Sequence, residues 1–296
     1  MEIDRYGVTR MDLCDIRDIK ALLSRHGFHF SKSMGQNFLI EGWVPQDIAE
    51  AAGCGDDIGV LEIGPGIGPL TAQLAQRCGK VVSVELDKAL LPVLGETMRE
   101  FNNVEIIPGD IMKLDIQALV SDKLNSLTPI ACANLPYNIT TPVITALLES
   151  GCFARITVMI QREVAMRVCA APGSPDYGAF SVFCQYHANC ERLFDVGPEC
   201  FLPAPKVTSS VIRLTPHPKP AEVENEKAFF QVVRAAFAQR RKTLLNALLS
   251  AFSSTHSKDD LRAAIAACGF PEDVRGERLG IPEFAILTKI LLPEKV

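Results

Sequence analysis

The stretch Glu62-Ile63-Gly64-Pro65-Gly66-Ile67-Gly68 begins within the apolar segment IGVLEIG, which starts at residue 58. After Pro69 it is followed by LTAQLAQRC. An apolar strand, a glycine-rich turn and a helix in this order are typical of the first unit of an α/β fold. Glycine lets the backbone turn sharply and approach a ligand closely. A dinucleotide loop needs GxGxxG, and the third glycine would fall on Pro69. The spacing is ExGxGxG instead, which predicts a different nucleoside ligand.

Further apolar segments follow this loop at residues 81–87, 104–110, 129–137 and 154–161, and helical segments separate several of them. Strands that alternate with helices predict a parallel sheet covered on both faces. Another strand is expected at residues 207–214, and helices are expected at residues 15–26, 44–52 and about 88–101. The segment TPHPKP, residues 215–220, predicts a linker because three prolines interrupt any regular element. After it the apolar periodicity is purely helical.

The sequence therefore predicts an α/β protein with a Rossmann-like, mostly parallel sheet and a small all-helical C-terminal domain. We expect an N-terminal helical segment (residues 1–56) that closes the ligand site. The sheet domain should span residues 57–215, and the helical domain residues 221–296.

Composition limits the location and the ligands. The 296 residues contain no apolar run long enough to cross a bilayer, and the charged N-terminus resembles no signal peptide. We therefore expect a cytoplasmic protein with no membrane contact. The ten cysteines form no CxxC pair, so no metal site is predicted. The net charge of −5 counts against nucleic acid as a partner, although the acidic excess lies before residue 216.

The ExGxGxG spacing resembles the S-adenosylmethionine loop of class I methyltransferases, and two carboxylates agree with that cofactor. Gly64 and Gly66 would lie near its ribose and amino-acid part. Glu85 ends the second strand, where it can accept hydrogen bonds from ribose hydroxyls. Asp110 ends the third strand, where it can accept a hydrogen bond from the amine of the cofactor's adenine. The alternative for both carboxylates is a helix N-cap.

The turn Asn134-Leu135-Pro136-Tyr137 ends the fourth strand and suits the methylation of an adenine amine. The lone pair of that amine is delocalised into the ring, so acceptors aimed at its protons would favour the pyramidal nitrogen that attacks. The Asn134 side chain and a backbone carbonyl of Leu135 or Pro136 can supply them. Tyr137 offers a flat face for an extruded base. The alternative is an ordinary strand-to-turn segment.

Two more residues complete the predicted site. Phe201 opens the proline-rich segment FLPAPKV and could clamp the other face of the base; alternatively it belongs to the core. Lys206 in the same segment could meet a phosphate. Three consecutive cations, Arg240, Arg241 and Lys242, predict a phosphate-binding patch at a helix N-terminus, and the alternative is a solvated helix end.

Together these motifs resemble the ribosomal RNA adenine dimethyltransferase family. The resemblance covers residues 16–292, and its further motifs are KSMGQNFL from residue 32, FAQRRKTL from residue 237 and VRGERL from residue 274. It implies dimethylation of two adjacent adenines in the 3′-terminal hairpin loop of small-subunit ribosomal RNA, within a 30S assembly intermediate. It also implies that Asn37 and Leu39 line the cofactor pocket with Asn134. A monomer of bacterial type is expected.

Three alternatives remain from the sequence. The related enzymes that methylate large-subunit RNA and confer macrolide resistance share most of these motifs, although residues 274–291 favour the small-subunit type. A non-catalytic RNA-binding factor on the same fold need not keep Glu85, Asp110 and the 134–137 turn. DNA adenine methyltransferases usually carry Asp where Asn134 stands.

Overall fold

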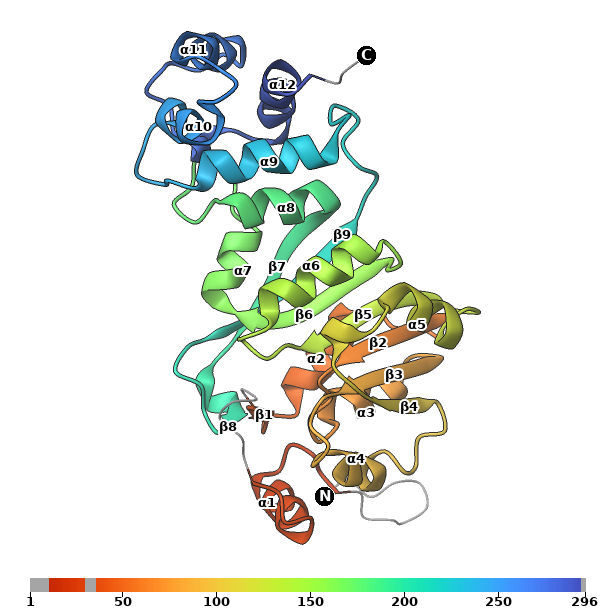
Figure 1. The fold of residues 1–296 in the computed structure, drawn as a ribbon. Helices are drawn as coiled ribbons and strands as arrows, with labels where there is room; N and C mark the ends of the chain where they lie inside the picture. The colour runs from red at the N-terminus through yellow and green to blue at the C-terminus, as the bar shows by residue number, and fades with distance from the viewer. Residues whose placement is uncertain (1–10, 30–35, 294–296) are drawn as a thin grey trace. The chain divides into compact units, whose positions relative to one another are not determined.

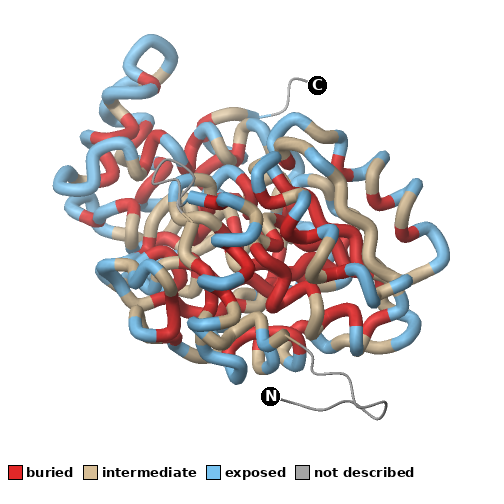
Figure 2. The backbone as a smooth tube through the Cα atoms, turned by 90° about the horizontal axis from the view of Figure 1, so that it is seen from below, coloured by how far each residue is buried: buried red, intermediate tan, exposed pale blue. Residues whose placement is uncertain are grey.

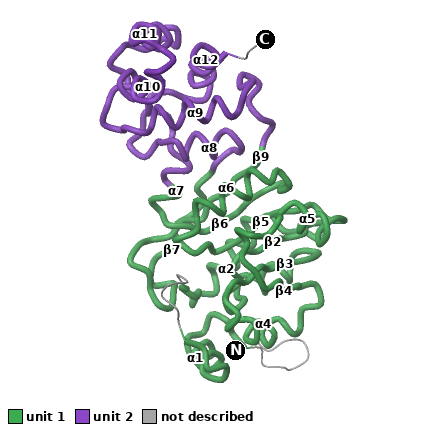
Figure 3. The backbone as a smooth tube through the Cα atoms, viewed as in Figure 1, with its two compact units in different colours: residues 1–165, 191–216 green, residues 166–190, 217–296 purple. Residues whose placement is uncertain are grey.

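The structure is a computed structural model that describes residues 11–29 and 36–293. The chain divides into two compact units, which are coloured separately in Figure 3. The first unit comprises Met1–Ala165 and Glu191–Pro216, and the second comprises Met166–Cys190 and His217–Val296. The predicted division into residues 1–56, 57–215 and 221–296 differs from these units in two ways: residues 1–56 group with the sheet, and residues 166–190 group with the C-terminal helices.

Aromatic packing explains why that segment joins the second unit. Tyr186 packs on Phe229 with ring centroids 5.4 Å apart, and Tyr177 packs edge-on against Phe237 at 5.9 Å. Both tyrosines are almost completely buried in one core with the C-terminal helices. Such contacts join residues that lie far apart in the sequence, so the position of the proline-rich linker did not reveal them.

The main sheet has seven strands in the order β4-β3-β2-β5-β6-β9-β7 (Figure 1). The pairs β2–β3, β3–β4, β2–β5 and β5–β6 are parallel, whereas β9 runs antiparallel to β6. This confirms the predicted mostly parallel sheet. The strands are β2 (Ile58–Ile63), β3 (Lys80–Glu85), β4 (Val104–Pro108), β5 (Thr128–Asn134), β6 (Arg155–Gln161), β7 (Ala188–Val196) and β9 (Ser209–Pro216).

Within the sheet, β3 and β4 extend from one edge of β2, and the chain then returns to place β5 along the other edge of β2. Ligands bind at such a reversal of strand order, beside the carboxyl ends of the strands. A separate two-stranded sheet pairs β1 (Phe38–Leu39) with β8 (Phe201–Leu202). This small sheet brings two segments of the predicted site together, although they are distant in the sequence.

Helices cover both faces of the sheet, as the sequence predicts (Figure 1). Buried side chains of α2 and α3 pack on β2, β5 and β6 in one core, and Figure 2 shows the buried residues gathered in the interior. The helix predicted at residues 88–101 is shorter, since α4 spans seven residues. The helices of this unit are α1 (Ile16–Arg25), α2 (Trp43–Ala51), α3 (Pro69–Ala75), α4 (Leu91–Thr97), α5 (Ile116–Lys123), α6 (Thr140–Ser150) and the first part of α7 (Arg162–Val168), with short turns η2 (Ile111–Lys113) and η3 (Pro198–Cys200).

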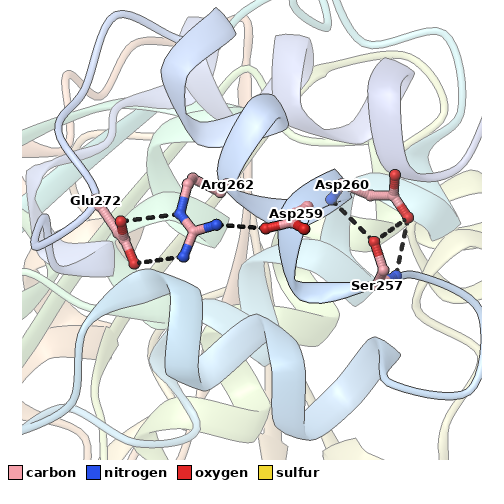
Figure 4. Close-up of polar contacts among 5 residues, drawn as sticks. All are labelled: Ser257, Asp259, Asp260, Arg262 and Glu272. Carbon is pink, nitrogen blue, oxygen red and sulfur yellow. Dashed lines mark hydrogen bonds and ion pairs between the residues drawn. The ribbon is translucent and has the colours of Figure 1, made fainter.

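The second unit is helical, which confirms the predicted helical C-terminal region. Ser257 caps one of its helices, since its hydroxyl accepts from the Asp260 N–H while the Asp260 carboxylate accepts from the Ser257 N–H (Figure 4). Arg262 binds Asp259 and forms a two-point pair with Glu272, which lies beyond the end of that helix. The helices are α8 (Ala179–His187), α9 (Glu226–Phe237), α10 (Leu244–Phe252), α11 (Lys258–Ala267) and α12 (Ile281–Leu291), with the short turn η4 (Gly276–Arg278).

Among the described residues, no helix combines the length and the apolar character that a transmembrane span needs.

Candidate active site

The glycine loop after β2 has the conformation that its residues require. Gly64, Gly66 and Gly68 have φ angles of 68°, 64° and 96°, a region that other residues rarely adopt. The loop is anchored because the Gly64 N–H donates to the Val84 carbonyl at 3.0 Å. A Cβ added at Gly66 would lie 3.4 Å from the Phe38 ring. The glycines therefore leave the backbone bare beside a cavity.

That cavity lies at the carboxyl edge of the sheet and belongs wholly to the first unit. The structure brings every predicted cofactor-binding and catalytic residue to its walls. These are Asn37, Leu39, Gly64, Gly66, Glu85, Asp110, Asn134, Leu135, Pro136, Tyr137 and Phe201. Residues 32–35 of the KSMGQNFL motif lie outside the described residues.

Glu85 presents a buried carboxylate to the cavity, with 6% of its surface exposed. Its Oε1 accepts a hydrogen bond from the Asp87 N–H at 2.7 Å. Burial raises the pKa of Glu85, and hydrogen bonds from the backbone N–H groups of Asp87 and Gly66 oppose that rise. Glu85 is therefore held against the glycine loop, which suits a group that accepts hydrogen bonds from hydroxyls.

Glu62 also lines the cavity, and the sequence analysis gave it no role. Its side chain is 1% exposed, and its Oε2 accepts from the Thr71 hydroxyl at 2.7 Å and the Ser83 hydroxyl at 2.6 Å. Burial raises the pKa of Glu62 to about 7, and the nearby Glu85 carboxylate adds to the rise. Glu62 thereby joins β2, α3 and β3 beneath the loop. The E of ExGxGxG was the available signal, but nothing in the sequence identified its hydroxyl partners.

Asp110 adopts the N-cap role that was the alternative from the sequence, and it also lines the cavity. Its Oδ1 accepts from the Met112 N–H at 3.0 Å and caps the short turn η2, and the residue also lines the cavity. Lys113 lies 3.7 Å from its other oxygen. The N-cap bond fixes the carboxylate at the edge of β4 while the residue still faces the pocket.

The turn after β5 contains two candidate acceptor carbonyls, those of Leu135 and Pro136, and hydrogen bonds within the chain occupy one of them. The Leu135 N–H donates to the Met159 carbonyl at 3.1 Å, which holds the turn to β6. The Pro136 carbonyl accepts from the Ile139 N–H and from the Thr140 hydroxyl, both at 3.2 Å. A carbonyl oxygen has two lone pairs, so these two bonds occupy the Pro136 oxygen. Of the two carbonyls left open by the sequence, the structure favours that of Leu135 as an acceptor for a ligand.

Tyr137 is held by a residue that the sequence analysis missed. Its hydroxyl lies 2.8 Å from the Ser209 hydroxyl on β9, and Ser209 is fully buried. Burial raises the pKa of Tyr137, and the Ser209 hydrogen bond opposes that rise. No local pattern marks Ser209, because its partner is far away in the sequence.

Phe201 is 2% exposed and packs in the core beneath the sheet, next to Leu39 across the β1–β8 pair. The core alternative therefore holds for most of its surface. Phe201 nevertheless contributes to the cavity wall, so a contact with a bound base remains compatible with its position.

The predicted cations lie on the surface, outside the cavity walls. Lys206 is exposed in the segment between β8 and β9. Arg240, Arg241 and Lys242 are exposed in the turn between α9 and α10, directly before Thr243, which caps α10. The Arg240 guanidinium donates to the Pro175 carbonyl at 2.6 Å.

Comparison with known proteins agrees with this geometry. Residues 27–265 match the family described as Ribosomal RNA adenine dimethylase. A relative named Ribosomal RNA small subunit methyltransferase A, from Geobacillus thermodenitrificans, is 46% identical over 93% of this chain and 95% of its own.

Two solved structures resemble the fold. A dimethyladenosine transferase from Plasmodium falciparum has a TM-score of 0.68 at 23% identity, covering 84% of this chain and 95% of its own. The 23S rRNA methyltransferase ErmE has a TM-score of 0.65 at 25% identity, covering 86% of this chain and 99% of its own. The match over most of the sequence, together with these folds, shows that the chain belongs to the ribosomal RNA adenine dimethylase family.

Proposed function

We propose that this protein transfers methyl groups from S-adenosylmethionine to the N6 amines of two adjacent adenines in the 3′-terminal hairpin loop of small-subunit ribosomal RNA. One observation carries the proposal: a single cavity is lined both by the glycine loop with Glu85 and Asp110 and by the 134–137 turn. The cofactor residues and the turn that suits an adenine amine therefore meet in one place.

The residues present fit the cofactor. Glu85 is a buried acceptor for the ribose hydroxyls, and Asp110 is an acceptor for the cofactor's adenine amine. The bare backbone at Gly64 and Gly66 allows close approach of the ligand. Asn37 and Leu39 close the wall from the β1 side. When bound, S-adenosylmethionine supplies an activated methyl group on a sulfonium, so the protein needs no strong base.

The turn orients the target amine. The Asn134 side-chain oxygen and the Leu135 carbonyl accept hydrogen bonds from its two N–H groups, which favours a pyramidal nitrogen with its lone pair free to attack. Pro136 fixes the turn, and its own carbonyl is used within the chain. Tyr137 stacks on one face of the extruded base and Phe201 contacts the other. Asparagine is an acceptor that orients the amine without removing a proton from it.

Binding of the RNA depends on local positive charge, because the chain as a whole carries −5. Lys206, Arg240, Arg241 and Lys242 bind backbone phosphates. The substrate is a 30S assembly intermediate in the bacterial cytoplasm, where the protein acts as a monomer in ribosome biogenesis. A particle can supply contacts that naked RNA lacks, and this accounts for an enzyme with an acidic net charge.

Primer-extension mapping tests the substrate. Small-subunit particles and naked small-subunit RNA, both from cells that lack the modification, are incubated with the protein and S-adenosylmethionine. We expect two adjacent modified adenines in the 3′-terminal loop, with faster modification of the particles. Large-subunit RNA serves as the matched control. Modification of large-subunit RNA alone would assign the chain to the activity named for ErmE.

A further inference from the structure

A cluster outside the cavity contains two arginines and a single carboxylate. Asp195 lies near the end of β7, and its Oδ1 accepts from Arg192 at 2.8 Å while its Oδ2 lies 3.4 Å from Arg162 Nε. The Ser210 hydroxyl donates to the same Oδ1 at 2.5 Å. Asp195 therefore fixes two guanidinium groups that come from different elements, and we call these three charged residues the Asp195 cluster.

The Asp195 cluster has a surplus of positive charge. Two arginines share one carboxylate, so its net charge is +1 in a chain whose total is −5. The side chains of Arg162 and Arg192 are 52% and 42% exposed. Each guanidinium has five N–H donors, and one carboxylate cannot engage all of them. The cluster thus presents hydrogen-bond donors and positive charge to solvent.

A neighbouring pair on the same sheet lacks this surplus. Arg213 of β9 pairs with Glu191 of β7 at 2.6 Å, which makes one arginine and one carboxylate. Charges on an edge strand such as β7 discourage pairing with other chains, and a neutral pair already serves that purpose. The second arginine on Asp195 needs a different explanation.

The position of the Asp195 cluster supplies one. Arg162 directly follows β6, whose last residue pairs with Ser209, and its N–H donates to the Thr208 carbonyl at 3.0 Å. This places Arg162 beside the segment that carries Lys206, at the carboxyl edge of the sheet. Ser209 bonds the Tyr137 hydroxyl, and the adjacent Ser210 bonds Asp195. Successive strand residues face opposite sides of a sheet. Tyr137 and the Asp195 cluster therefore flank the start of β9 on its two sides.

We propose that Arg162 and Arg192, oriented by Asp195, bind backbone phosphates of the RNA strand that carries the target adenine. The inference rests on the proposed function, because a base is extruded from a strand whose backbone must be held. Arginine suits this role, since its planar fork matches phosphate oxygens. Asp195 is a positioning residue that keeps both guanidinium groups at the start of β9, beside the segment that carries Lys206.

The test measures how binding of a synthetic RNA depends on salt. The probe is a hairpin with the 3′-terminal loop sequence of small-subunit RNA, and the full chain is titrated at several salt concentrations. Each lost contact to a single strand should reduce the slope of log K against log salt by about 0.7, so Arg162→Gln with Arg192→Gln should reduce it by about 1.4. Lysine at both positions keeps the charge and should restore most of the slope, which a merely structural role would not do.

Arg213→Gln is the matched control, because it removes an arginine from the same sheet but from a neutral pair. It should leave the slope unchanged. A double glutamine variant that keeps the wild-type slope and affinity overturns the proposal, as does an equal loss in the Arg213 control. Methyl transfer to small-subunit particles is measured in parallel with the wild-type chain. An arginine-dependent slope on the hairpin without methyl transfer to the particles would uphold this surface and refute the proposed function.

Discussion

Removing the hydrogen bond between Tyr137 and Ser209 should cost different amounts of stability, depending on which of the two residues is changed. The hydroxyl oxygens lie 2.8 Å apart, Ser209 is fully buried, and Tyr137 keeps some exposure beside the cavity. Tyr137→Phe leaves the Ser209 hydroxyl without this partner in the interior. Ser209→Ala leaves only the tyrosine hydroxyl, which can turn towards water at the cavity. The same bond is lost in both variants, but the stranded groups differ.

The magnitudes follow from burial. A neutral hydrogen bond contributes about 0.5–1.5 kcal/mol net, whereas a buried polar group left unpaired costs about 1–3 kcal/mol. We therefore expect Tyr137→Phe to lower the free energy of unfolding by about 1–3 kcal/mol and Ser209→Ala by about 0.5–1.5 kcal/mol. The double variant strands neither group, so its loss should be clearly smaller than the sum.

The same bond should affect the reaction through the ring's position. Both single variants keep the aromatic ring but lose the hydrogen bond that positions it. We therefore expect each to slow methyl transfer by about tenfold, equivalent to ~1.4 kcal/mol, without a change in cofactor affinity. Urea unfolding followed by circular dichroism measures stability, and single-turnover transfer measures the rate. Additive stability losses, or a wild-type rate in Ser209→Ala, would refute the reasoning that this bond holds the ring.

Three further predictions concern the cavity. Glu85→Ala should weaken S-adenosylmethionine binding by about ten- to a hundred-fold, because charge-assisted bonds of about 1.5–3 kcal/mol are lost; calorimetric titration of a folded variant with unchanged affinity would remove Glu85 from the site. Burial raises the pKa of Glu62 from 4.5 to about 7, so the folded protein holds a proton that the unfolded chain releases, and the stability that this proton provides is lost as pH rises from 4.5 to 7. Glu62→Gln should therefore gain up to about 3 kcal/mol relative to the wild type between pH 4.5 and pH 8 in urea unfolding, and an equal difference at both pH values would contradict the shift. Phe201→Leu should keep the fold and the cofactor affinity but lower kcat/KM for RNA by about 5- to 100-fold, as expected for a stacking contact of about 1–3 kcal/mol; unchanged kcat/KM would leave Phe201 as core alone.

The sequence predicted the residues that stand at strand ends. Glu85, Asp110 and Asn134 follow apolar strands, and parallel strands place their carboxyl ends at one edge of the sheet. Their convergence on one cavity could therefore be predicted from the alternation of strands and helices. The glycine spacing predicted the loop for a different reason, because the positive φ angles of the loop exclude most other residues.

Contacts between distant segments could not be predicted in this way. The two-residue strands β1 and β8 carry no local signal, yet they fix Leu39 beside Phe201. Ser209 and Ser83 look like ordinary strand residues until their partners, Tyr137 and Glu62, are placed. For the same reason, the aromatic contacts that draw residues 166–190 into the second unit were not apparent from the sequence.

Single-turnover methyl transfer by Asn134→Ala tests most directly whether the turn after β5 performs the reaction. The wild-type and variant proteins act on small-subunit particles at saturating S-adenosylmethionine, because Asn134 also borders the cofactor's cavity. If Asn134 accepts a hydrogen bond from the attacking amine, that bond strengthens in the transition state. Its loss should then slow transfer by about 10²–10³, or ~2.7–4 kcal/mol, with little change in RNA affinity. A variant that binds the particles and transfers methyl groups at nearly the wild-type rate would contradict the account.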